Sequence, residues 1–239
     1  MRCGWVLVTL YTGPFDIFVY WCVQRARRAV EQSEPSLWEQ SVESTIHCVA
    51  GDASGILLVA VVANWLRLPM GVELIAAYVA GFAVGLLLVQ APSMKSTFGS
   101  YRGAVRGPLL PETLSMNAIM AGMIPVMIIL TSRSMSAMKP TAVRFWGAMA
   151  LAVVVSAGTT FPVNWWLVTR GLKHGTGGEE RGRLRHAVSA TNKLTAALLT
   201  LAMLAGGIIL ADRYGDFSLS AGDTVDMPLK SSRGSMEST

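Results

Sequence analysis

The sequence predicts an all-α protein, a single bundle of six membrane-spanning helices with five as the alternative count. Of its 239 residues, 52% are apolar and only 15% are charged, whereas soluble domains carry about 25% charged residues. The charged residues also collect in short segments between long apolar runs. Those runs have about the 20 residues that a helix needs to cross a bilayer, so we assign the chain to a membrane.

Six apolar runs define the predicted spans, at about residues 4–22, 46–66, 72–90, 112–130, 142–168 and 191–211. The first run is the weakest, because Gly13-Pro14 and Asp16 interrupt it, and five spans remain if it does not insert. Between the first two runs, the apolar Leu37 and Trp38 stand beside glutamates, which predicts a short surface helix near the lipid headgroups.

Helix-breaking residues set the later boundaries. Pro69 predicts a tight turn between the second and third spans. Gly158 and Pro162 predict that the fifth span is broken near its end. Residues 1–211 thus form one domain, and the Ser-, Gly- and Asp-rich residues 212–239 are predicted to be a disordered tail.

Lysine and arginine counts orient the bundle. With the first loop inside, twelve basic residues lie in inner segments and eight in outer ones, and cytoplasmic loops carry the excess. This arrangement puts both termini outside. The net charge of +5 then reflects the loops and is no nucleic-acid footprint. The expected partners are the lipid bilayer and, through helix contacts, other membrane proteins or a second copy of the chain.

The second span carries the most unusual residues. His47, Cys48 and Asp52 lie in its first turns, although ionisable groups within a membrane are costly and are usually kept for a function. Cys48 and Asp52 share one ridge of the helix, and His47 lies on the ridge beside it. The alternative is an interfacial histidine, a core cysteine and a carboxylate solvated at the headgroups.

Glycines flank this polar patch. Gly51 and Gly55 lie on the ridge of His47, and the third span offers a similar pair in Gly81 and Gly85. Small residues four apart let two membrane helices approach closely. The two pairs therefore predict a helix–helix packing seam.

The predicted topology brings further polar residues to the same membrane face. Glu112 opens the fourth span from the inner side, Asn164 lies near the inner end of the fifth, and His174 follows in the loop. Convergence from separate helices is what a binding site needs. Helix–helix hydrogen bonding is the alternative role for Asn164, and a solvated position in the loop is the alternative for His174.

Methionines form a row on the fourth span. Met116, Met120, Met123 and Met127 follow Glu112 at intervals of 4, 4, 3 and 4 residues, which keeps all five on one helix face. Thioethers suit soft ions such as Cu(I), so the row is suited to a metal path. The alternative is ordinary packing, because methionine fills irregular gaps between helices.

Three segments resemble a bacterial family of multi-spanning membrane proteins known only as a domain of unknown function. They are HCVAGDASG at 47–55, PETLSMNAIMAGMIPVM at 111–127 and FPVNWWLVTRGLKHG at 161–175. The resemblance extends from about residue 35 to 211. It implies a multi-pass protein of the bacterial inner membrane and emphasises His47, Cys48, Asp52, Asn164 and His174, but it implies no activity.

The leading hypothesis is the handling of a soft metal ion, Cu(I), by binding or translocation. The methionine row would line the path, His47, Cys48 and His174 would form an inner site, and Asp52, Glu112 and Asn164 would orient ligands or relay protons. One alternative is a non-catalytic membrane subunit or assembly factor that docks a partner's helix. Another is a proton-coupled carrier. The sequence has no HExxH, G-x-S-x-G or Walker motif, so an enzyme is not favoured.

Overall fold

The computed structural model describes most of the chain, namely residues 36–92, 94, 99–173 and 189–216 together with the single residues Trp21 and Arg25. Within these residues the chain is helical and has no strand, and five helices are long and apolar enough to cross a membrane. The predicted helical membrane bundle is thus confirmed. The predicted first span at 4–22, apart from Trp21, and the tail beyond 216 lie outside the described residues.

Five spans are described. They are α3 (Leu37–Leu66), α4 (Met70–Ala83) with its π-helical continuation η1 (Val84–Gln90), α7 (Leu109–Arg133), α8 (Val143–Thr169) and α9 (Ala190–Tyr214). A short helix, α6 (Tyr101–Arg106), and a 3₁₀ turn, η2 (Met135–Met138), lie between spans. Most of these bounds lie within a few residues of the predicted ones. Only α3 differs strongly, because it begins nine residues early.

The start of α3 corrects the prediction of a separate surface helix. Ser36 caps the helix: its Oγ accepts a hydrogen bond from the Glu39 N–H at 3.3 Å, while the Glu39 carboxylate accepts one from the Ser36 N–H at 2.7 Å. This reciprocal capping box starts a helix. Ser41 and Thr45 are buried in the following turns. The polar segment is therefore the first part of the span itself.

The predicted break in the fifth span is also wrong. Pro162 lies inside α8, which continues to Thr169. Prolines are tolerated in membrane helices when neighbouring helices satisfy backbone groups. One turn before the proline, the Thr159 hydroxyl donates to the Ala118 carbonyl of α7 at 2.7 Å. This bond ties α8 to α7 where the proline weakens the helix.

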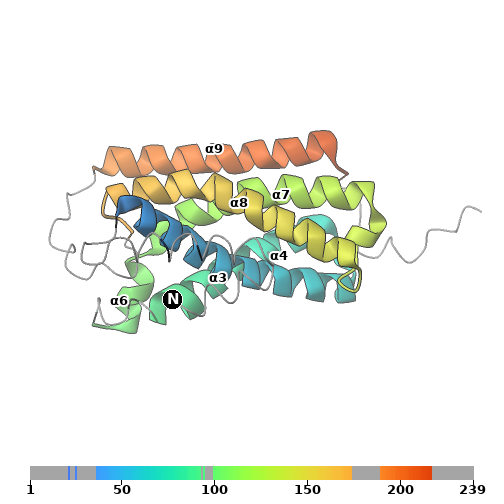
Figure 1. Cartoon of the computed structure of the whole chain (residues 1–239), viewed down its shortest axis with the longest axis horizontal. Coiled ribbons are helices and arrows are strands. Elements are labelled where there is room, and N and C mark those ends of the chain that lie inside the picture. The colour runs from blue at the N-terminus through green and yellow to red at the C-terminus, as the bar shows by residue number, and fades with distance from the viewer. Residues whose placement is uncertain are drawn as a thin grey trace, which may run out of the picture.

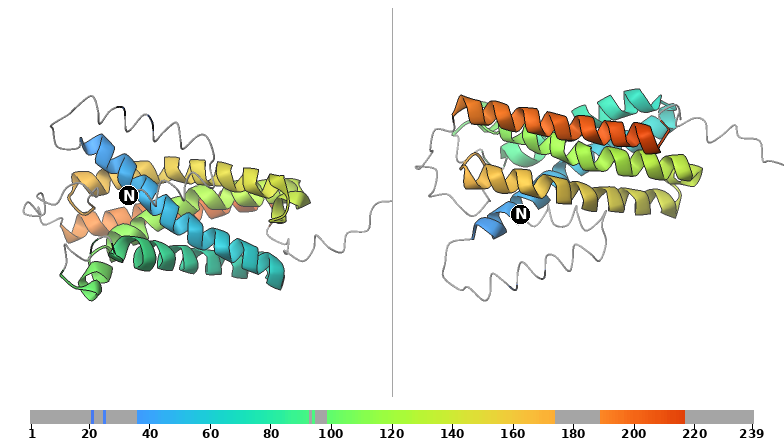
Figure 2. Two further views of the ribbon diagram at one scale, coloured as in Figure 1. Left: turned by 60° about the horizontal axis from the view of Figure 1, so that its bottom comes forward. Right: turned by 90° about the horizontal axis from the view of Figure 1, so that it is seen from above.

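Helix α7 lies at the centre of the bundle. It contacts α3, α4, α8 and α9, and Figure 1 shows α9 running along it on one side with α3 and α4 on the other. In the right-hand view of Figure 2, α7 runs between α9 and α8. The most apolar part of α7 is 67% buried, against 17% for α9. Residues on α7 are therefore the ones placed to build an interior site.

The crossing of α3 with α4 and η1 depends on the four predicted glycines. A Cβ on Gly51 would lie 2.8 Å from the Gly85 Cα, and a Cβ on Gly55 would lie 2.8 Å from the Gly81 Cα. Side chains at these positions would force the backbones apart. The close approach brings Asp52 of α3 directly against η1.

Candidate functional site

Two groups of side chains occupy the interior at opposite ends of the bundle. We call the first the lysine cluster; it comprises Cys48, Asp52, Glu112, Ser115, Asn164 and Lys173. We call the second the thioether cavity; it is lined by methionines of α4, α7 and α8. The first involves the middle of α3 and the beginning of α7, and the second involves the later parts of both helices.

A turn after α8 directs Lys173 into the bundle. Gly171 adopts a left-handed conformation with φ of +64°, which favours glycine. The backbone N–H groups of Leu172 and Lys173 both donate to the Leu167 carbonyl, at 2.9 and 3.2 Å. The chain therefore folds back over the helix end, and Lys173 is only 5% exposed.

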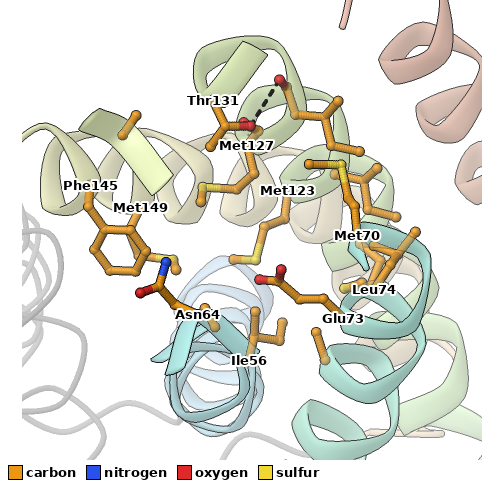
Figure 3. A pocket seen from close by; sticks show the side chains of 16 residues that line it. Ile56, Asn64, Met70, Glu73, Leu74, Met123, Met127, Thr131, Phe145 and Met149 are labelled. Atoms are coloured by element: carbon orange, nitrogen blue, oxygen red, sulfur yellow. Dashed lines mark hydrogen bonds between the residues drawn. The ribbon is translucent and has the colours of Figure 1, made fainter. Parts of the chain in front are cut away.

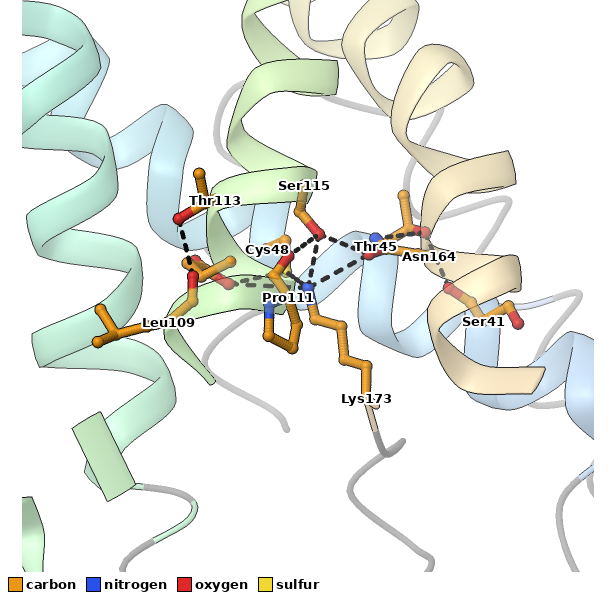
Figure 4. Close-up of polar contacts among 10 residues, drawn as sticks. Ser41, Thr45, Cys48, Leu109, Pro111, Thr113, Ser115, Asn164 and Lys173 are labelled. Atoms are coloured by element: carbon orange, nitrogen blue, oxygen red, sulfur yellow. Dashed lines mark hydrogen bonds and ion pairs between the residues drawn. The ribbon is translucent and has the colours of Figure 1, made fainter. Parts of the chain in front are cut away.

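The Lys173 ammonium is surrounded by acceptors from three helices, as Figure 4 shows. Its Nζ donates to Ser115 Oγ at 2.9 Å and to Asn164 Oδ1 at 3.2 Å, and it contacts the Cys48 sulfur. It also forms an ion pair with Glu112 Oε2 at 3.7 Å. Burying an ammonium is expensive unless it is paired and hydrogen-bonded in this way.

The charge on Lys173 is stable in this setting. Burial lowers the pKa of its ammonium, but the acidic groups around it, Cys48 and Glu112 foremost, raise it by more, so the pKa lies above its ordinary value. The ion pair with Glu112 and the oxygen acceptors of Ser115 and Asn164 favour the charged form of Lys173. It acts as a fixed positive charge inside the bundle.

Asn164 joins the cluster to the first turns of α3. Its amide donates to Thr45 Oγ1 at 3.1 Å, and its carbonyl oxygen accepts from Ser115 Oγ at 2.8 Å. The predicted location of Asn164 beside the other polar groups agrees with this geometry. Its bonds are of the helix–helix type that the sequence left as an alternative.

Asp52 lies next to Glu112 but has no donor of its own. It is fully buried, and neither carboxylate oxygen has a hydrogen-bond partner among the described residues. Both acids meet at Gly85: a Cβ there would be 2.9 Å from Glu112 Oε1 and closer still to Asp52 Oδ1. Two carboxylates thus share the neighbourhood of one ammonium.

His47 and Cys48 face different surroundings. His47 hydrogen-bonds with the backbone of Val89, whereas Cys48 contacts Lys173 and donates to Glu112 Oε2 at 3.7 Å. In the part of the chain that the structure describes, no group of three or more His, Cys, Asp or Glu side chains is arranged to hold a metal ion. His174 lies outside that part, so the inner metal site stays a prediction.

The thioether cavity has a volume of about 100 Å³. Five methionines contribute to its lining, namely Met70, Met120, Met123, Met127 and Met149. Three of them belong to the predicted row on α7. Met116, the fourth member of that row, does not line the cavity; it is fully buried at the α3–α4 crossing, where its Cε would lie 2.9 Å from a Cβ on Gly81.

A few polar groups complete the cavity wall. They come from Asn64, Glu73 and Thr131. Figure 3 shows the Glu73 carboxylate pointing into the space between the methionine side chains, near Met123. A mostly apolar pocket with a few convergent polar groups is the usual form of a small-ligand site.

Sequence reasoning missed two members of the lysine cluster, Ser115 and Lys173, and all cavity residues outside the methionine row of α7, Met70, Glu73 and Met149 among them. Lys173 was counted only among the basic residues that orient the bundle, although it lies next to His174 in the KHG motif that supported the family resemblance. Met70, Glu73 and Met149 share helix faces with apolar residues that give no functional signal. Their role depends on how α4 and α8 cross α7, which no spacing within one helix reveals.

These features define a class, the multi-pass helical membrane proteins with an ionisable cluster inside the bundle. The chain belongs to the family described as a domain of unknown function, DUF4396, whose model matches residues 37–173, more than half of the chain. Every residue of the lysine cluster and the thioether cavity falls within this range. Neither the curated proteins nor the solved structures contain a significant match.

Proposed function

We propose that the protein binds a soft monovalent metal ion, Cu(I), in the thioether cavity and handles it within the membrane. The observation that carries the proposal is the convergence of five thioethers from α4, α7 and α8 on one cavity. Soft thioether ligands select Cu(I) over the hard divalent ions. They carry no proton that binding must displace.

The carboxylate at the cavity supports the same choice. A cation in a membrane interior needs a compensating charge, and thioethers are neutral. Glu73 places a carboxyl group beside the sulfur atoms, and this group can supply the negative charge when a cation binds. One carboxylate with several thioethers matches a monovalent ion better than a divalent one.

Packing alone explains this region less well. Methionine does fill irregular gaps in helical cores, and Met120 and Met123 are each only 2% exposed. A region filled for packing would leave no cavity and would have no reason to place a carboxylate in it. Here the methionines surround an open volume that also receives Glu73 and Asn64.

Met116 suggests how an ion could move on from the cavity. It continues the methionine row of α7 toward the lysine cluster and lies at the α3–α4 crossing near Asp52. Thioethers exchange their ions readily, so a row of them favours stepwise movement over trapping. Met116 is the position that would separate binding from translocation.

The test is Cu(I) binding by the full-length protein in detergent under reducing conditions, in competition with a chromogenic Cu(I) chelator. Met120, Met123 and Met127 are replaced together by leucine, which conserves volume and removes sulfur. We expect the affinity to fall by at least about tenfold, equivalent to about 1.4 kcal/mol. Met203→Leu in α9, outside the cavity, is the matched control and should bind as the wild type does.

Two further variants refine the result. Glu73→Gln should weaken Cu(I) binding because it removes the compensating charge. Met116→Leu should leave binding in detergent unchanged and slow Cu(I) transfer across proteoliposomes. The proposal is overturned if the wild-type protein retains no Cu(I), or if the triple leucine variant binds it with unchanged affinity.

A further inference from the structure

The lysine cluster contains an unbalanced charge. Glu112 is 1% exposed and Asp52 is fully buried, and among the described residues Lys173 forms an ion pair with Glu112 but none with Asp52. Lys173 Nζ contacts Glu112, Cys48, Ser115 and Asn164. Asp52 receives no hydrogen bond from the described residues. If both acids were ionised, the cluster would hold a net negative charge in a dry interior, which is strongly unfavourable.

We propose that Asp52 and Glu112 bind one exchangeable proton between them, so that the cluster is an intramembrane proton-binding site with Lys173 as its fixed cation. The two carboxyl groups converge on one point, because a Cβ on Gly85 would collide with Asp52 Oδ1 and lie 2.9 Å from Glu112 Oε1. Carboxyl groups this close cannot both ionise easily, and they share a proton. The shared proton supplies the donor that the Asp52 oxygens otherwise lack.

The other titratable groups near Asp52 do not remove the imbalance. Tyr78 of α4 donates its hydroxyl to Asn117 Oδ1 at 2.8 Å. Cys48 on the same helix donates to Glu112. His47 hydrogen-bonds with the Val89 backbone, and its Nε2 has no partner among the described residues. From α8 the cluster receives the neutral Asn164.

The packing around Asp52 favours a proton over a metal ion. Asp52 Oδ1 fills the space that a side chain on Gly85 would need. A sodium or calcium ion needs several oxygen ligands at more than 2 Å, whereas a proton needs only one acceptor. Glu112 provides that acceptor directly. The π-helical turn at η1, which carries Gly85, is also of a kind found often at functional sites.

This site is independent of metal in the thioether cavity. It gives the protein the group that a proton-coupled carrier requires: an acid in the hydrocarbon region that gains and loses a proton. Lys173 lies on the segment that follows α8. Its contact with Glu112 therefore couples the protonation of the two carboxyl groups to that segment. The proton site and Cu(I) binding therefore succeed or fail in separate experiments.

Infrared spectroscopy of the purified full-length protein in lipid nanodiscs tests the proposal. A protonated carboxylic acid has a C=O stretching band that is distinct from the carboxylate bands and shifts in D₂O. We expect this band in the wild type at neutral pH and its loss in Asp52→Asn, because Glu112 then pairs with Lys173 as a carboxylate. Glu73→Gln removes a half-buried acid of α4 that lies in the thioether cavity and should leave the Asp52-dependent band in place.

A second variant is expected to change the band in the opposite direction and so complements Asp52→Asn. Lys173→Met removes the fixed cation, so a second proton should bind and the carboxylic acid band should grow. The proposal is overturned if the wild type lacks the band at neutral pH, or if the band is unchanged both in Asp52→Asn and in Lys173→Met. The proposal is also overturned if the wild type holds a tightly bound sodium or other metal ion that is lost in Asp52→Asn, because that ion would then occupy the site in place of the proton.

Discussion

The lysine cluster and the thioether cavity use the same helices in opposite ways. In the cluster, α3, α7 and α8 contribute hydrogen-bonding and charged groups that contact one ammonium directly. In the cavity, the same three helices and α4 surround an open volume with mostly apolar side chains, flexible thioethers among them. A paired buried charge fixes its surroundings, because breaking the pair is costly. Thioether side chains adjust to what enters.

The comparison separates a rigid end of the bundle from an adaptable one. Loss of a group should therefore affect stability most in the cluster and ligand binding most in the cavity. Variants at the two ends can be ranked by that rule, and a variant that violates it would show that the two regions act as one site.

The largest effect on stability is expected from Lys173→Met. The change leaves Glu112 without its cation, and breaking a buried pair costs about 3–5 kcal/mol. Thermal unfolding in detergent measures the loss, and Lys193→Met, at an exposed position of α9, is the control. The loss of stability relative to the wild type should shrink as the pH is lowered, because protonation of the unpaired acids removes their repulsion in the folded state. A stability difference between Lys173→Met and the wild type that grows on acidification would contradict the assignment of Lys173 as the cation of the buried acids.

The spans and their glycine seam could be predicted because both follow from periodicity within one helix. Apolar length gave five spans close to their observed bounds, and the spacing of Gly51 and Gly55 matched the contact with Gly81 and Gly85. The polar start of α3 was missed because its buried residues look like a surface helix. Their neighbours, Asn164 among them, belong to another helix.

The key residue of the cluster could not be predicted in the same way. Lys173 lies in a Gly-rich connection, and a lysine in a loop usually faces water. Only the left-handed turn at Gly171 returns it to the bundle. The cavity presents the same difficulty: Met70 and Met149 are single residues near helix ends, and they meet Met123 through helix crossing alone.

An intermediate effect is expected from Gly85→Ala. The added Cβ would collide with Asp52 Oδ1 and lie 2.9 Å from Glu112 Oε1, and overpacking typically costs about 1–3 kcal/mol. Gly147→Ala in α8 is the matched control, because a Cβ there meets nothing within 4 Å. It should be neutral or stabilising by up to about 1 kcal/mol, since alanine favours helix. Equal unfolding temperatures for the two variants would show that the α3–η1 contact is looser than described.

The smallest effect is expected from Cys48→Ser, and it separates the two regions most sharply. A serine hydroxyl can still interact with Lys173 and donate to Glu112, so the unfolding free energy should change by less than about 1.5 kcal/mol. Cu(I) affinity should not change, because the thiol is engaged in the cluster and the cavity holds the thioethers. The same chelator competition that detects the triple leucine variant measures this. A loss of Cu(I) binding in Cys48→Ser as large as in that variant would mean that the ion reaches the thiol, and the lysine cluster would then be part of the metal path.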